Sequence, residues 1–125
     1  MTDPRRLRAL RIVLVLTAVA FMGLYGLILI WPAGWAWGHG HSHHEMMIVG
    51  VYAILGVFLI RAARDPEAHR SLIWFTVWSS AAHAAIMTLQ ALGDPMERGH
   101  FVGDVPALFV VALALGLLMS PSKAA

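Results

Sequence analysis

Four long apolar stretches limit what this chain can fold into. They cover residues 12–31, 43–63, 71–92 and 105–119. The first three are close to the roughly 20 residues that an α-helix needs to cross about 30 Å of hydrocarbon, and the fourth is shorter. Only 13% of the residues are charged, whereas a soluble domain has about 25%. A soluble globular enzyme is therefore excluded. The sequence predicts an all-α integral membrane protein, a four-helix bundle in a single domain over residues 1–125.

Polar residues between the stretches predict where the helices begin. Aspartate and serine are favourable N-caps, and proline suits the first helical turn because it needs no N–H there. A serine followed three residues later by a glutamate matches the capping box. We therefore expect caps at Ser42, which has Glu45 three residues on, and at Asp3, Asp65, Asp94 and Asp104, each within two residues of a proline.

The basic residues predict the orientation. Eight of the nine precede the first stretch, lie at the end of the second or between the second and the third, or follow the fourth, and only Arg98 lies on the other side. Because basic residues are retained on the cytoplasmic side, both termini are expected inside (N-in, C-in). Trp31, Trp35 and Trp37 are then expected in an aromatic belt at the outer surface. The basic residues are split among three sites beside the membrane, so the expected partner is the lipid bilayer and not nucleic acid.

Small residues in the first two stretches predict close contact between their helices. Gly23 and Gly26 lie in the first stretch, and Gly50, Ala53 and Gly56 lie in the second. Small side chains let helix backbones approach each other closely inside a membrane. We therefore expect these five residues at helix–helix contacts.

The two outward loops contain a concentration of groups that bind metals. Imidazole is a ligand of zinc and copper, and carboxylates can complete such a site. The candidate ligands are four histidines within six residues of the first loop and three residues of the second: His39, His41, His43, His44, Glu97, His100 and Asp104. They predict a zinc or copper site on the outer face. The alternative is a solvated polar loop, in which Asp104 only caps its helix.

A polar stripe runs along the third stretch. Polar groups in hydrocarbon need partners, so we expect this stripe to face the other helices, and Trp74 and Trp78 to face lipid. We expect His83 to be neutral and hydrogen-bonded, with Tyr25 or Tyr52, which lie at a similar depth, as its partner. At about 100° per residue, the residues within about 60° of His83 are Thr76, Ser79, Ser80, Met87 and Gln90.

The middle of the chain resembles a known family. The motifs that carry the resemblance are residues 41–47 (HSHHEMM), 51–56 (VYAILG), 63–66 (ARDP), 69–73 (HRSLI), 78–80 (WSS) and 83–87 (HAAIM). They are similar to those of small bacterial four-span membrane proteins catalogued only as a domain of unknown function. The resemblance implies four helices and a bacterial plasma (inner) membrane, without a reaction, cofactor or ligand. A more distant likeness, to DoxX-type four-helix membrane proteins, rests on no specific residues.

Three functions are open at this point. The first is non-enzymatic binding of zinc or copper by the outer-face ligands. The second is an accessory or structural subunit, bound to other membrane subunits or to a second copy. The third is a redox anchor in which His83, Tyr52 and Gln90 hold a quinone or, less expected, a haem. The chain has no cysteine and no phosphate-binding loop, so an enzyme is not favoured.

Overall fold

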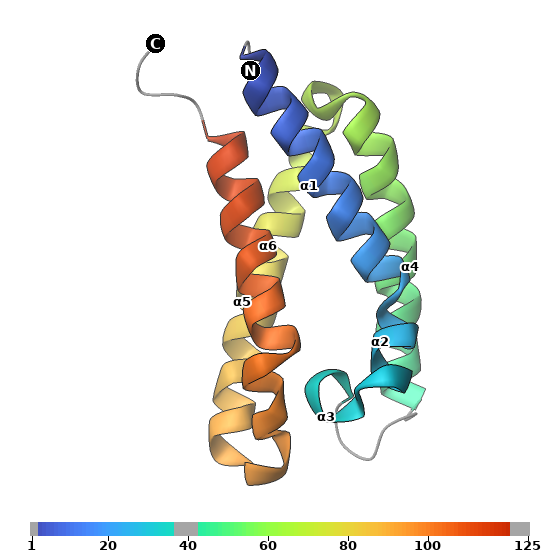
Figure 1. The fold of residues 1–125 in the computed structure, drawn as a ribbon, viewed down its shortest axis with the longest axis vertical. Coiled ribbons are helices and arrows are strands. Elements are labelled where there is room, and N and C mark those ends of the chain that lie inside the picture. The colour runs from blue at the N-terminus through green and yellow to red at the C-terminus, as the bar shows by residue number, and fades with distance from the viewer. Residues whose placement is uncertain (1–2, 37–42, 121–125) are drawn as a thin grey trace.

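The computed structural model describes residues 3–36 and 43–120, and these residues form helices without any strand (Figure 1). The side chains of residues 43–45 are not described. The elements in chain order are α1 (Pro4–Met22), α2 (Leu24–Ile30), α3 (Pro32–Trp35), α4 (His43–Arg64), the 3-10 helix η1 (Pro66–His69), α5 (Arg70–Gly93), the 3-10 helix η2 (Pro95–Val102) and α6 (Asp104–Met119).

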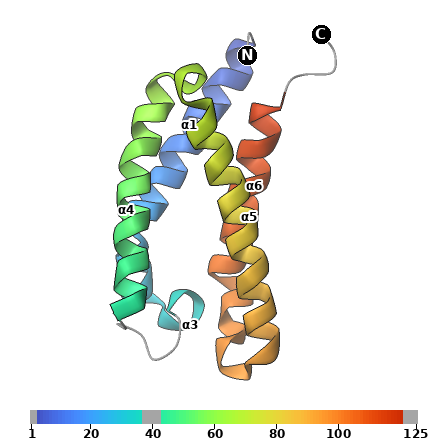
Figure 2. The same ribbon diagram turned by 180° about the vertical axis from the view of Figure 1, so that it is seen from behind.

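The long helices form two pairs. α1 packs mainly on α4, and α5 packs mainly on α6. The start of α1 and the end of α6 lie at the same end of the molecule as η1 (Figure 1). From η1, α4 and α5 diverge toward the opposite end, where α3 lies between the two pairs (Figure 2). The fold is therefore closed at the end that carries η1 and splayed at the other.

Among the described residues, two to four helices are long and apolar enough to cross a membrane. Met46–Arg64 in α4 and Pro66–Gly93, which includes α5, are each long and apolar enough. α1 with α2, and η2 with α6, qualify only as bent pairs. Large apolar side chains are also exposed on the outside of the helices, for example Ile54 at 63% and Trp78 at 69%. Such surfaces are compatible with contact to a lipid bilayer.

The first apolar stretch is not the single straight helix that was expected over residues 12–31. α1 ends at Met22, and α2 continues from Leu24 at an angle of 59°. Gly23 lies at the break, where its backbone leaves helical geometry and its N–H donates to the carbonyl of Val19 at 2.9 Å. Glycine favours such a break because its backbone loses more conformational entropy in a helix than that of any other residue.

Three of the four expected aspartate caps are confirmed. The carboxylates of Asp3, Asp65 and Asp94 accept hydrogen bonds from backbone N–H groups two or three residues ahead, at 2.9, 3.4 and 3.0 Å. The expected cap at Asp104 is wrong. Asp104 is already the first residue of α6, with Gly103 as the N-cap, and its carboxylate bonds a histidine side chain instead. The expected cap at Ser42 lies outside the described residues.

The hydrophobic core is concentrated at the closed end of the bundle. Leu14 from α1, Leu59 from α4, Ile73 from α5 and Leu115 from α6 are all fully buried there. Arg6 adds a polar tie at this end, because its side chain donates to the carbonyl of Leu118 at 2.8 Å and to that of Ser120. These carbonyls end α6 and have no partner within the helix. The buried core and the Arg6 hydrogen bonds thus stabilise the closed half of the bundle.

Of the glycines in the first two stretches, Gly56 makes the expected close contact between α1 and α4. A Cβ atom on Gly56 would lie 2.6 Å from Met22 Cγ and 2.8 Å from the Ala18 carbonyl oxygen. The expectation is wrong for Gly26 and Gly50, where a Cβ atom would meet nothing within 4 Å. Close packing of α1 on α4 is thus set at Gly56, just before the bend.

Substitution at Gly56 tests this contact. We expect Gly56→Ala to lower the free energy of unfolding by about 1–3 kcal/mol, the usual cost of overpacking. Gly50→Ala in the same helix is the matched control, and we expect it to leave stability unchanged or raise it, because the added methyl group meets open space. Thermal unfolding of the detergent-solubilised variants measures both. Equal stability of the two variants would contradict the proposed contact.

Candidate functional site

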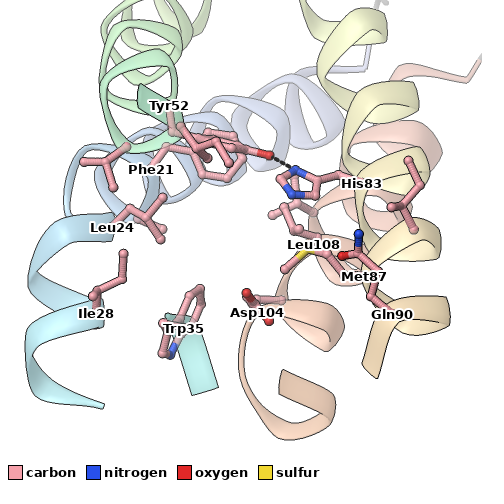
Figure 3. A pocket seen from close by; sticks show the side chains of 16 residues that line it. Phe21, Leu24, Ile28, Trp35, Tyr52, His83, Met87, Gln90, Asp104 and Leu108 are labelled. Carbon is pink, nitrogen blue, oxygen red and sulfur yellow. Dashed lines mark hydrogen bonds between the residues drawn. The ribbon is translucent and has the colours of Figure 1, made fainter. Parts of the chain in front are cut away.

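A cavity of about 370 Å³ occupies the splayed half of the bundle (Figure 3). It lies between the two helix pairs, and α3 contributes to its end. Its volume is within the range of pockets that hold small organic ligands. The lining residues are Ala20, Phe21, Leu24, Ile28, Trp35, Ile48, Val49, Tyr52, His83, Ile86, Met87, Gln90, Asp104, Ala107, Leu108 and Val111.

Partly exposed residues of both α4 and α5 line the cavity. Ile48 lines it from α4 and is 45% exposed, and Ile86 lines it from α5 and is 55% exposed. Both helices are long and apolar enough to cross a membrane. An opening between them would face the acyl chains of a bilayer rather than water.

The principal polar contact inside the cavity joins Tyr52 and His83. The Tyr52 hydroxyl hydrogen-bonds His83 Nδ1, as Figure 3 shows. The Tyr52 ring is held by an edge-to-face contact with Phe21, with ring centroids 4.7 Å apart. Of the two tyrosines predicted as partners of His83, the structure selects Tyr52. Because the two side chains bond each other directly, they leave no room for a haem iron between them.

The second ring nitrogen of His83, Nε2, points away from Tyr52. In Figure 3 the ring lies at the cavity wall with this nitrogen turned toward the interior. Within the part of the chain that the structure describes, Nε2 has no hydrogen-bond partner. Gln90, two turns further along α5, also lines the cavity. The three residues predicted to hold a cofactor, His83, Tyr52 and Gln90, are therefore brought to one cavity.

The buried face of α5 is rotated from the predicted polar stripe. Its buried residues are Ile73, Thr76, Val77, Ser80, Ala84, Met87 and Ala91. The prediction is confirmed for Thr76, Ser80 and Met87, and for Trp78 on the exposed side. It is wrong for Trp74, which is half-buried and packs against the core. Gln90 is exposed but lines the cavity between the helix pairs. α6 packs on the small residues of α5, so His83 lies at the edge of the buried face.

A second polar cluster lies in η2, where α5 connects to α6. His100 is fully buried, and its Nδ1 lies 2.7 Å from Asp104 Oδ1. Its Nε2 lies 2.7 Å from the carbonyl oxygen of Ala36 and 3.0 Å from Glu97 Oε2. A carbonyl oxygen only accepts, so Nε2 carries a hydrogen and donates it. A second proton is then shared between Nδ1 and the Asp104 carboxylate, which makes this a charge-assisted hydrogen bond.

A family model matches residues 3–124, nearly the whole chain. The chain belongs to DUF6632, a family of unknown function. No curated protein and no solved structure matches it. The resemblance to a domain of unknown function is thus confirmed, while the bacterial origin and the DoxX likeness stay predictions. Membership in DUF6632 assigns no role to any residue, so function has to be argued from the cavity and the polar clusters.

The predicted metal site of this DUF6632 chain stays a prediction. His39 and His41 lie outside the described residues, and the side chains of His43 and His44 are not described. Among the described residues, no group of three or more His, Asp or Glu side chains is arranged to hold a metal ion. Both ring nitrogens of His100 are already engaged in hydrogen bonds.

Two features of the site were not predicted from the sequence. Trp35, expected in an aromatic belt with Trp31 and Trp37, lines the cavity and is half-buried. The backbone carbonyl of Ala36 is the acceptor for His100. Both follow from the turn into α3, and a backbone acceptor leaves no mark in the sequence. A proline at the start of α3 was the available signal, since it favours a new helix.

A double-mutant cycle tests the pair of His100 and Asp104. His100→Ala leaves a buried carboxylate without its partner, so we expect stability to fall by about 3–5 kcal/mol. Adding Asp104→Ala should cost much less than the sum of the single changes, because the carboxylate that lost its bond to His100 is then also removed. The control cycle uses the exposed ion pair of Glu67 and Arg70, for which we expect a coupling of about 0–1 kcal/mol. Additive losses at His100 and Asp104 would refute the pairing.

Proposed function

We propose that this protein is a membrane protein that binds a lipophilic ligand with a carbonyl head group, of the quinone class, in the cavity between its two helix pairs. The observation that carries the proposal is His83 Nε2, which faces a mostly apolar cavity without a partner among the described residues. Ligand sites are mostly apolar, with few polar groups that fix the orientation of the ligand. His83 and Tyr52 are such groups.

The hydrogen bond between Tyr52 and His83 determines what the cavity offers a ligand. The Tyr52 hydroxyl hydrogen needs an acceptor, because a buried donor without one is costly. His83 Nδ1 is the acceptor that the structure provides. The hydrogen of the neutral ring is then on Nε2, which points a donor into the cavity. A carbonyl oxygen, as in a quinone, satisfies this donor.

An opening of the cavity between α4 and α5 would admit a ligand that arrives through the bilayer. Ile48 and Ile86 at this opening are apolar and partly exposed. A hydrocarbon tail can lie between the helices while the head group reaches His83. The ligand need not cross water, and its tail would replace lipid chains that contact the same surface.

The proposed setting is the plasma membrane of a bacterium, crossed four times with both termini in the cytoplasm. The arginines of α1, α4 and α5 support this orientation, because all seven lie toward the closed end. They are Arg5, Arg6, Arg8, Arg11, Arg61, Arg64 and Arg70. Basic residues are enriched on the cytoplasmic side. The cavity and the two outward loops then lie in the outer half of the membrane.

Ligand titration tests the proposed binding. We expect a short-chain benzoquinone added to the protein in nanodiscs to quench the fluorescence of Trp35, with Trp35→Phe identifying that signal. His83→Ala should weaken binding by about 3–10-fold, the value of one hydrogen bond. Tyr52→Phe keeps the aromatic ring but leaves Nδ1 without its donor, and it should weaken binding less. His69→Ala, a histidine in η1 remote from the cavity, is the matched control.

The controls separate head-group recognition from general affinity for an apolar cavity. An alkylbenzene of similar size, which has no carbonyl group, should bind equally to the parent and to His83→Ala. Equal quinone affinity in those two proteins would overturn the proposal. Metal retained by the outer histidines, or a haem spectrum lost in His83→Ala, would favour the other predicted functions. If the protein binds neither quinone, metal nor haem, the result would favour an accessory subunit.

The orientation has its own test. Reporter fusions at Ala68 and Lys123 should report a cytoplasmic position, and a fusion at Gly40 should report an external one. Ala68 lies in η1 at the closed end, whereas Gly40 belongs to the first outward loop of the proposed arrangement. A cytoplasmic signal from Gly40 would reverse the orientation and place the histidine loop inside the cell.

A further inference from the structure

The end of the cavity is closed by a short helix. α3 spans Pro32–Trp35 and lies between α2 and η2 at the splayed end of the bundle (Figure 1). Trp35 lines the cavity from this helix, and in Figure 3 it lies below Phe21 and Tyr52. A four-residue helix has little stability of its own. Contacts with other elements must therefore keep α3 in position.

The backbones of α3 and η2 approach each other at two glycines. A Cβ atom on Gly99 would lie 2.3 Å from the Ala33 carbonyl oxygen, and one on Gly103 would lie 2.2 Å from that of Gly34. Any larger residue would push the two segments apart. These glycines allow the contact, but they provide little attraction of their own.

His100 provides the attraction between these segments. It lies between Gly99 and Gly103 in the chain, and its Nε2 donates to the carbonyl of Ala36, the residue that follows α3. Its Nδ1 is bound by Asp104 at the start of α6. His100 is fully buried and Asp104 is 5% exposed, so water competes little for these bonds. One side chain thus links α3 to the base of α6.

We propose that His100 is a positioning residue that latches α3 across the end of the cavity and keeps this end closed to water. The latch does not depend on which ligand the cavity binds. With α3 seated, Trp35 forms part of the cavity wall. With the latch broken, α3 separates from η2, and water enters from the splayed end.

Cysteine labelling tests the latch, because the chain has no cysteine of its own. Ala107→Cys places a reporter on the cavity wall, and a charged maleimide that cannot enter lipid is added to the protein in nanodiscs. We expect slow labelling in the parent. His100→Ala should accelerate it by about tenfold or more, the factor that the loss of one charge-assisted hydrogen bond permits.

Two further variants separate the latch from the histidine itself. Gly103→Ala forces α3 away while leaving His100 in place, and it should accelerate labelling as well. Gly26→Ala in the neighbouring helix α2 adds a methyl group that meets nothing within 4 Å, and it should leave the rate unchanged. Gly103→Ala also provides a test if His100→Ala fails to fold.

A second reporter distinguishes a local opening from general loosening. Ala62→Cys lies in the closed half of the bundle and is fully buried. We expect it to remain unlabelled in every variant. Rapid labelling of Ala107→Cys in the parent, an unchanged rate in both His100→Ala and Gly103→Ala, or equal acceleration at both reporters would each overturn the latch. Labelling requires no ligand, so this outcome is independent of whether a quinone binds.

Discussion

The contact of α1 with α4 at Gly56, followed at once by the bend at Gly23, determines the rest of the fold. The Ala18 carbonyl and the Met22 side chain lie where a Cβ of Gly56 would be, so the last turn of α1 is held against α4. The chain then bends by 59°, and α2 stays in contact with α4. The separation of the two helix pairs leaves the cavity, which the turn through α3 closes at its end.

The helices themselves could be predicted because apolar residues in such numbers leave few other structures. A backbone in hydrocarbon must satisfy its polar groups internally, which selects helices over long uncharged stretches. Depth could also be predicted, since each residue advances a helix by about 1.5 Å. Counting from the ends placed Tyr52 near His83, and the structure joins them. The bend could not be predicted, because a glycine within an apolar stretch is equally consistent with close packing and with a break.

Several features that sequence reasoning missed depend on residues far apart in the chain. Asp104 has the local pattern of a cap, yet its partner is His100, which is itself fixed by the carbonyl of Ala36. Trp35 is of a residue type that is common at membrane surfaces, yet α3 places it in the lining of the cavity. Trp74 faces the core because α5 presents its small residues to α6, which rotates the helix from the orientation that polarity alone suggests.

The two polar clusters differ in what they leave for a ligand. At the splayed end of the bundle, near α3, the Asp104 carboxylate is balanced by His100, so a cation bound there would have to replace an existing partner. Deeper in the cavity, an ionised His83 would be costly in hydrocarbon, and the neutral ring bonded to Tyr52 offers a hydrogen-bond donor without a charge. An anion would lose its hydration and gain no counter-charge at that position. The chemistry that matches such a donor is a neutral acceptor, and for this reason a carbonyl head group fits the cavity better than an ion.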